Sequence, residues 1–431
     1  MRVLMLSWEY PPQIIGGMGR HVDELTRTLA RQGVEIHVIC PGDNQALAQQ
    51  QIDGVHVYRV PPYSPSTPDF ISQVIQMNVG LLERASSLIY TLGSVHLVHA
   101  HDWLVAYASR ALKHAYQIPL VATIHATEFG RNNGLHTDQQ RYIGSVEWWL
   151  TYEAWRVICC SYYMQDELQR VFHLPADKIE LISNGINLED FQVNDKLINH
   201  LSAFRCTYAQ PDEKIVFCIS RLVHEKGVQV LLDAVPRVLA AYPATKFIIA
   251  GRGPNQSYLQ HKAQQMGVDH RVNFIGFIDD QTRNCLYRVA DVTVIPSLYE
   301  PFGIVVLEGM AAGCPVVVSD TGGVSEIIEH RVDGLKAQTG SAESLAGCIL
   351  EILNQPEFGN SLKEKAYQKV IGSYSWDIVA RKTTALYRQV LKARTEIDWP
   401  VNHRVSTVPL SKASSYLSAL TKIKDRYLLK H

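Results

Sequence analysis

Short apolar runs alternate with longer segments of helical hydrophobic periodicity through the first half of the chain. The runs that predict buried strands are Val3–Ser7, Glu35–Cys40, His96–Ala100, Leu120–Ile124, Val157–Cys160 and Ile179–Ile182. The helices predicted between them include Gly19–Arg31, Ile71–Ser87, Leu104–Tyr116 and Asp138–Trp155. Strands that alternate with helices indicate βαβ units and a parallel sheet.

The second half of the chain repeats this alternation. Its predicted strands are Ile215–Ile219, Lys246–Ala250, Val272–Ile275, Val292–Ile295 and Val316–Ser319. Its predicted helices are Val228–Ala240, Ser257–Met266, Gln281–Ala290 and Gly303–Ala312. The strands are almost continuously apolar, which is typical of strands that helices cover on both faces. We therefore expect an α/β protein with two Rossmann-like, doubly wound parallel sheets.

Polar sequence interrupts the alternation between the two halves and predicts a linker there. The expected organisation is an N-terminal domain at 1–190, a linker at 191–212, a C-terminal domain at 213–375, a helix at 376–394 that crosses back to the first domain, and a basic tail at 395–431. Two open α/β domains that face each other place a cleft at the carboxyl ends of both sheets, where ligands bind in such folds.

The tail carries one apolar helical stripe with cations near it. The stripe consists of Tyr416, Leu417, Leu420, Ile423, Tyr427 and Leu428, and the cations are Lys422, Lys424, Arg426 and Lys430. Docking of this stripe on its own domain is one interpretation. Peripheral contact with an anionic membrane surface, or with a partner, is the other.

Composition narrows the functional classes. The chain has 431 residues, of which 46% are hydrophobic and 19% charged, with a formal charge of −1. These values argue against general disorder and against a dedicated nucleic-acid-binding protein. No uncharged run approaches a membrane span, and the first residues read as a strand rather than a signal peptide. Eight cysteines without a CxxC motif favour a reducing, cytoplasmic location.

The first strand ends in a glycine-rich turn, Gly16-Gly17-Met18-Gly19, directly before a helix. Glycines at a helix N-terminus let backbone N–H groups approach an anion. The turn is not the dinucleotide fingerprint, because Val22 stands where that motif requires its third glycine. A phosphate-binding turn and a plain tight βα turn remain equal alternatives on this segment alone.

Histidines follow two neighbouring strands of the first half. His99 and His101 alternate onto one strand face, and Asp102 is the only nearby third ligand, on the opposite face. This arrangement favours polar residues that face a cleft over a metal site. His125 ends the next strand along the chain, in the same topological position.

The second half places cations and carboxylates at equivalent positions. Arg221 and Lys226 lie between a strand end and a helix, where two cations and a helix N-terminus would suit a diphosphate. Glu300 and Glu308 are separated by seven residues around a Pro-Phe-Gly turn. Carboxylates accept hydrogen bonds from vicinal hydroxyls such as those of ribose and sugars. A further glycine turn contains Gly253.

Together these motifs resemble those of the retaining nucleotide-sugar glycosyltransferases of family 4, which have the two-Rossmann GT-B fold. The resemblance covers Met1 to about Lys392. His-Ala-His-Asp-Trp at 99–103 and Thr-Ile-His-Ala-Thr-Glu at 123–128 resemble the glycogen-synthase-like α-glucan glucosyltransferases. Ile14 stands where starch-type synthases carry a lysine, so the donor nucleotide stays open between UDP and ADP.

The resemblance implies a role for each motif residue. The implied catalytic residues are His125, Arg221, Lys226 and Glu300. His125 and Glu300 would touch the transferred sugar, and the two cations would neutralise the departing diphosphate. The implied donor-binding residues are Gly17, Gly253, Phe277, Phe302, Gly303, Ile304 and Glu308, the last of them at the ribose. Asp102 and Trp103 would face the acceptor.

The chain has no Asp-x-Asp motif, so we expect neither a metal nor another cofactor. The resulting prediction is transfer of glucose from UDP- or ADP-glucose to an α-1,4-glucan. A family 4 hexosyltransferase with a lipid-linked or small-molecule acceptor is the alternative. A sugar-nucleotide 2-epimerase and a non-catalytic glucan-binding protein are weaker ones.

Overall fold

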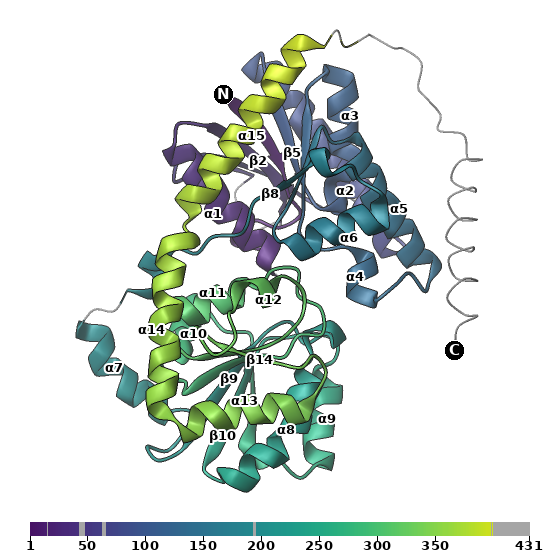
Figure 1. Cartoon of the computed structure of the whole chain (residues 1–431). Coiled ribbons are helices and arrows are strands. Elements are labelled where there is room, and N and C mark those ends of the chain that lie inside the picture. Colours follow the sequence, from purple (N-terminus) through teal and green to yellow (C-terminus); the bar gives the residue numbers. More distant parts are fainter. Residues whose placement is uncertain (15, 43–47, 63–65, 193–194, 398, 400–431) are drawn as a thin grey trace. The chain divides into compact units, whose positions relative to one another are not determined.

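A computed structural model of the chain describes residues 1–14, 16–42, 48–62, 66–192, 195–397 and 399. The tail stripe predicted at 416–428 lies outside these residues. No helix among the described residues is long and apolar enough to cross a membrane. The polypeptide forms two sheets, each flanked by helices (Figure 1).

The first sheet has eight strands in the order β3-β4-β2-β1-β5-β6-β7-β8. Its strands are β1 (Arg2–Leu6), β2 (Glu35–Pro41), β3 (Gln49–Ile52), β4 (Val55–Val60), β5 (Leu97–His101), β6 (Leu120–Ile124), β7 (Arg156–Cys159) and β8 (Ile179–Leu181). All pairs are parallel except β3 with β4. The first strand pairs with β2 on one side and β5 on the other, so the strand order reverses beside it.

The second sheet has six parallel strands in the order β11-β10-β9-β12-β13-β14. They are β9 (Lys214–Ile219), β10 (Thr245–Ala250), β11 (Val272–Gly276), β12 (Val292–Ile295), β13 (Val316–Ser319) and β14 (Leu335–Ala337). This is the 3-2-1-4-5-6 order of the doubly wound fold, with its switch point between β9 and β12. The predicted fold of two parallel Rossmann-like sheets is confirmed.

Fifteen α-helices connect and cover the strands over the described residues. They are α1 (Gly17–Arg31), α2 (Phe70–Leu92), α3 (Ala106–Tyr116), α4 (Glu128–Asn132), α5 (Asp138–Glu153), α6 (Tyr162–Phe172), α7 (Asp195–Cys206), α8 (Val228–Ala241), α9 (Gln256–Gln265), α10 (Asp280–Val289), α11 (Ile304–Ala311), α12 (Gly322–Ile327), α13 (Ala342–Asn354), α14 (Pro356–Ser373) and α15 (Trp376–Glu396). Because helices cover both faces, the central strands are buried throughout; Val3, Leu4, Met5 and Leu6 are all fully buried.

Helix α15 returns to the first sheet, as the sequence predicts. Trp376, Val379, Tyr387 and Val390 on this helix belong to the same core cluster as strand β1. The Tyr387 hydroxyl lies 2.7 Å from Nδ1 of His99 on strand β5. Figure 1 shows α15 running alongside the first sheet after α14 has packed against the second. The two sheets are thus joined by chain crossings at residues near 190 and 375.

Two parts of the fold differ from the sequence interpretation. The predicted linker contains helix α7, and Arg205 on it pairs with Asp291 at 3.1 Å, so this segment is tied to the second sheet. Leu197, Leu201 and Phe204 have a helical spacing, but the polar residues before and after them favour a linker. The β3–β4 hairpin was also not predicted. Asp53 and Gly54 form its turn with φ of 47° and 83°, which is the backbone that an Asp-Gly hairpin turn adopts.

Candidate active site

Four of the predicted site residues follow the carboxyl ends of inner strands of the two sheets. Gly17 follows β1, and His125 follows β6 in the first sheet. Lys226 follows β9 and Glu300 follows β12, the two strands that flank the switch point of the second sheet. Loops at these ends are where doubly wound folds bind their ligands.

Helices α1 and α11 flank different sheets, and their N-termini lie next to each other. Their first residues are Gly17 and Ile304. A Cβ atom added to Gly17 would lie 3.5 Å from Cδ1 of Ile304, so the two segments are within van der Waals reach. Gly303, which caps α11, has φ of 98°, a conformation that residues with a Cβ rarely adopt. N–H groups at a helix N-terminus attract an anion. At α1 the N-cap N–H of Gly16 already donates to Glu9 Oε2 at 3.0 Å.

Lys226 and Glu300 form an ion pair at the carboxyl end of the second sheet. Lys226 Nζ lies 2.8 Å from Glu300 Oε2, and the two side chains are only 18% and 10% exposed. Ser297 donates its hydroxyl to the same carboxylate oxygen at 3.0 Å. The pair therefore has a defined geometry rather than that of two solvated surface charges.

Arg221 lies close to this pair along the chain and is less constrained. Its guanidinium is 3.6 Å from Glu225 Oε1, and its side chain is 44% exposed. A guanidinium with this exposure keeps donors available for a phosphate. The predicted cation pair thus consists of one fixed ammonium, Lys226, and one more accessible guanidinium.

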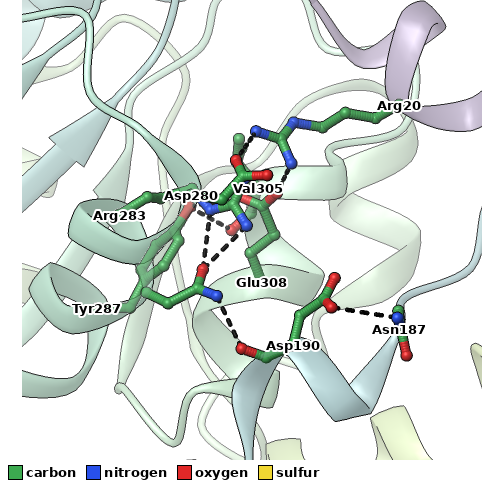
Figure 2. A network of polar contacts seen from close by, with 9 residues as sticks. Arg20, Asn187, Asp190, Asp280, Arg283, Tyr287, Val305 and Glu308 are labelled. Atoms are coloured by element: carbon green, nitrogen blue, oxygen red, sulfur yellow. Dashed lines mark hydrogen bonds and ion pairs between the residues drawn. The ribbon is translucent and has the colours of Figure 1, made fainter. Parts of the chain in front are cut away.

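Glu308 is the centre of a network of polar contacts that joins the two sheets (Figure 2). Tyr287 donates its hydroxyl to Glu308 Oε2 at 3.0 Å, and Arg283 Nη1 lies 3.4 Å from Oε1. Arg20, on α1 of the first sheet, places Nη1 at 3.8 Å from the same oxygen and donates from Nη2 to Asp280 at 2.6 Å. Glu308 is 3% exposed, so its charge is balanced by buried and half-buried donors.

The same network extends to the chain crossing after the first sheet (Figure 2). Asn284 donates to the backbone carbonyl of Asp190 at 2.8 Å, and Asn187 donates to the Asp190 carboxylate at 3.2 Å. The residues around Glu308 are therefore braced by the segment that connects the two sheets.

Asp102 contacts the backbone of His125 and not its imidazole ring. The Asp102 carboxylate accepts a hydrogen bond from the backbone N–H of His125 at 2.7 Å. Asp102 is 6% exposed and has φ of 59°, and burial raises its pKa to about 6. Burial, with a contribution from Arg131, lowers the pKa of His125 to about 3, so its imidazole is neutral at neutral pH. The predicted acceptor-side role of Asp102 stays a prediction; its visible contact is with the His125 backbone.

Three histidines from different elements form a cluster behind this point. His21, His101 and His125 bring potential ligand atoms within 4.8 Å of one another. The sequence interpretation that Asp102 is the only nearby ligand for the strand histidines is wrong, because α1 contributes His21 and the loop after β6 contributes His125. His101 Nδ1 and His125 Nε2 lie 3.0 Å apart, while Nε2 of His21 and of His101 are buried without a partner.

The other predicted residues fall into two groups. Phe302 and Trp103 are each 5% exposed and pack into the core, so their side chains do not present a surface to a ligand. Phe277, by contrast, is 67% exposed at the end of β11. Gly253 lies so close to the preceding loop that an added Cβ would be 2.3 Å from the Leu222 carbonyl oxygen. Donor and acceptor roles for these four residues stay predictions.

Sequence reasoning missed the donors that surround Glu308 and the imidazole of His21. Arg283 and Tyr287 are four residues apart on α10, a spacing that places both on one helix face. Arg20 and His21 directly follow the glycine turn, yet nothing in the sequence indicates which way they point. The packing of α1 on the first sheet, with its N-terminal residues against α10 and α11, brings them to the site.

Comparison with known proteins identifies the family. The model for "Glycosyltransferase Family 4" matches residues 15–190, and that for "Glycosyl transferases group 1" matches residues 205–369. An uncharacterised glycosyltransferase of Methanocaldococcus jannaschii is 38% identical over 90% of this chain and 98% of its own.

Two further proteins extend the comparison. A glycogen synthase of Mycobacterium tuberculosis is 34% identical over 90% of this chain and 94% of its own. The solved structure of a sucrose-phosphate synthase from Thermosynechococcus elongatus has a TM-score of 0.79 at 23% identity and covers 91% of this chain and 99% of its own. The chain therefore belongs to glycosyltransferase family 4, whose members are retaining enzymes of the GT-B fold that use nucleotide-sugar donors.

Proposed function

We propose that this glycosyltransferase transfers glucose from UDP- or ADP-glucose to the end of an α-1,4-glucan, with retention of the anomeric configuration. The observation that carries the proposal is the fixed Lys226–Glu300 pair, 2.8 Å apart at the switch point of the second sheet. The similarity to a glycogen synthase over nine-tenths of the chain supports the choice of donor sugar and acceptor.

The proposed roles follow from charge and position. The donor diphosphate would lie between the N-termini of α1 and α11, near Gly17 and Ile304. Lys226 and Arg221 would neutralise the phosphate oxygens as the bond between the sugar C1 and the diphosphate breaks. Glu300, braced by Ser297, would accept a hydrogen bond from a sugar hydroxyl. Preorganised charges of this kind stabilise a transition state because they need no reorganisation.

The bond changes balance without a redox partner. The acceptor hydroxyl oxygen forms a bond to the sugar C1 on the face that the diphosphate leaves, and the departing phosphate oxygen takes the hydroxyl proton. Glu308 would bind the ribose of the donor, as the family resemblance implies. Phe277, exposed at the end of β11, would border the nucleobase.

Incubation with UDP-glucose and with ADP-glucose, each with and without maltohexaose, tests the proposal. We expect release of the nucleoside diphosphate and lengthening of the glucan, with new α-linkages seen by proton NMR. Release that depends on a lipid-linked or small-molecule acceptor, with no glucan extension, would establish the alternative acceptor class. Conversion of the donor without any acceptor would indicate an epimerase.

A further inference from the structure

His101 is a completely buried imidazole directly behind His125. It ends strand β5, its exposed fraction is 0%, and its Nδ1 atom lies 3.0 Å from Nε2 of His125. The two rings are stacked, with centroids 5.3 Å apart and an interplanar angle of 21°. His125 is half-buried, whereas its neighbour has no route to solvent. In this pair the imidazole of His125 has an exposed edge, whereas that of His101 is fully buried and contacts His125 from behind.

The hydrogen bond between the rings fixes the location of one proton. Burial lowers the pKa of both imidazoles, so each carries a single proton at neutral pH. If His125 were the donor, the proton of His101 would lie on Nε2, which is buried without a partner. Orphaned buried N–H groups are rare in folded proteins. With the proton on Nδ1 instead, His101 is the donor to His125, and its buried Nε2 is an acceptor without a partner rather than an unpaired N–H group. An unpaired acceptor is the more common of these two states in folded proteins.

The consequence for His125 is a proton on Nδ1. Among the described residues this atom makes no hydrogen bond, and it is not buried. It is therefore the accessible nitrogen of the pair. We propose that His101 is a positioning residue that holds His125 in the Nδ1-protonated tautomer, so that His125 donates a hydrogen bond to a hydroxyl of the transferred sugar. The proposal rests on the proposed function for the identity of the acceptor of that bond.

The remaining contacts of His125 limit its other orientations. The ring of His21 packs against it edge-on with centroids 4.7 Å apart, and the backbone N–H of His125 is held by Asp102. His21 itself packs edge-on against Trp376 of α15 at 5.5 Å. These contacts hold the ring on its buried sides and leave its Nδ1 edge accessible, and the hydrogen bond to His101 selects one tautomer in this position.

A shared metal ion is the competing use of these histidines. Coordination by His125 Nε2 would require a lone pair directed at the ion, but this atom faces Nδ1 of His101 at hydrogen-bond distance. The potential ligand atoms of the cluster extend to 4.8 Å from one another. The hydrogen-bonded arrangement therefore accounts for His125 without an ion, and metal content enters the test as an outcome.

Two substitutions of His101 distinguish the effect of its hydrogen-bond donor from the effect of the space that its side chain fills. In His101→Asn the side-chain amide nitrogen occupies roughly the place of Nδ1 and keeps a donor, whereas His101→Leu removes it and keeps an apolar side chain. The matched control is His99→Leu. His99 is equally buried on the same strand, but its nitrogens pair with Tyr387 and Thr123 and not with His125.

The experiment combines a substrate-free and a kinetic measurement. ¹⁵N NMR of histidine-labelled protein, with His125 assigned through His125→Gln, reports the tautomer; we expect Nδ1–H in the wild type and in His101→Asn, and its loss in His101→Leu. We expect kcat to fall about 10- to 100-fold in His101→Leu, the cost of a misplaced positioning group. His101→Asn should restore most of kcat, and His99→Leu should lose stability but not kcat.

Three results would overturn the inference. One is an Nε2–H tautomer of His125 in the wild type. Another is an equal fall of kcat in His101→Leu and His99→Leu at matched melting temperature. The third is stoichiometric zinc in purified protein that is lost in both His101→Leu and His21→Leu. A chain that transfers no glucose from either donor would refute the proposed function alone, because the tautomer is measured without substrate.

Discussion

Arg20 on helix α1 and Glu308 on helix α11 belong to different sheets, yet Arg20 Nη1 lies 3.8 Å from Glu308 Oε1. The carboxylate that the resemblance assigns to the donor ribose is thus already in contact with the first domain. Arg283 and Tyr287 also contact this carboxylate, at Oε1 and Oε2 respectively. A ribose that donates to Glu308 would therefore join a charge-balanced, preorganised group rather than an isolated carboxylate.

Glu308→Gln should weaken donor binding more than it slows the chemical step. A contact made equally in the ground state and the transition state raises KM and leaves kcat nearly unchanged. Hydrogen bonds to a charged group contribute about 1.5–3 kcal/mol, so we expect the donor KM to rise about 10- to 100-fold. Steady-state kinetics with varied donor at saturating acceptor measure this split.

Asp280→Asn is the control for Glu308→Gln. Asp280 shares Arg20 and Arg283 with Glu308, but its side chain is 68% exposed. We expect a change in donor KM of less than about threefold, in line with the small contribution of exposed ion pairs. A large fall of kcat at unchanged KM in Glu308→Gln would contradict the ribose assignment.

The sequence predicts the fold well because its signals are local. The apolar runs at Val3–Ser7 and Ile215–Ile219 need only strand periodicity to be recognised, and they form β1 and β9. The return of α15 to the first sheet was also predicted. Helix α7 is not predicted, because the polar residues around it favour a linker, although Phe204 packs against the core and Arg205 pairs with Asp291.

The site is predicted only in part because its contacts are not local. The Lys226–Glu300 pair brings together residues 74 positions apart, and a strand-end argument places both at one edge of the sheet. Arg20 and Asp280 are 260 positions apart and belong to different sheets. Residue type and spacing cannot indicate such a contact; it follows from the way that the two halves of the chain pack.

Chelation should leave turnover largely unchanged. The absence of Asp-x-Asp from the sequence predicts that cations of the protein neutralise the diphosphate. The prediction also tests the cluster of His21, His101 and His125, because among the described residues this is the one place where three potential metal-ligating side chains converge. We expect the rate after dialysis against EDTA to stay within about twofold of the untreated rate. Complete loss, restored by manganese, magnesium or zinc, would refute it.

Glu153 should contribute stability that acid removes. Burial disfavours its charge, but hydrogen bonds and charges from Lys113 and His114 outweigh burial and lower its pKa to about 2 from 4.5. The unfolded chain therefore binds more protons between these values, and the folded state loses stability as the pH falls through them. The full contribution, present above pH 4.5, is about 3 kcal/mol at 1.36 kcal/mol per pKa unit.

Urea unfolding of Glu153→Gln between pH 7 and pH 3 checks this contribution. At pH 7 the variant should be less stable than the wild type, and the difference should shrink as the pH approaches 3. Glu180→Gln, an exposed carboxylate on the neighbouring strand β8, should show no such convergence. A constant difference across this range would contradict the assigned pKa.

Lys226→Ala should lower kcat by at least about 10². Negative charge grows on the diphosphate as its bond to the sugar breaks, and removal of one preorganised electrostatic donor typically costs about 10²–10³ in kcat. Lys226 is 18% exposed and held by Glu300 at 2.8 Å, so its ammonium is in place before the charge develops. Donor hydrolysis without transfer should fall in parallel, since both reactions expel the same leaving group.

Lys262→Ala provides the matched control for this substitution. Lys262 forms an ion pair of the same length, 2.8 Å to Asp233, and is 22% exposed, but it lies on α9, and neither residue is among the predicted site residues. Its loss should change stability by at most about 1 kcal/mol and leave kcat unaltered. If Lys226→Ala behaves like Lys262→Ala, with unimpaired turnover in a folded protein, then Lys226 is only a structural partner of Glu300. The diphosphate would in that case be neutralised elsewhere, with Arg221 the first residue to test.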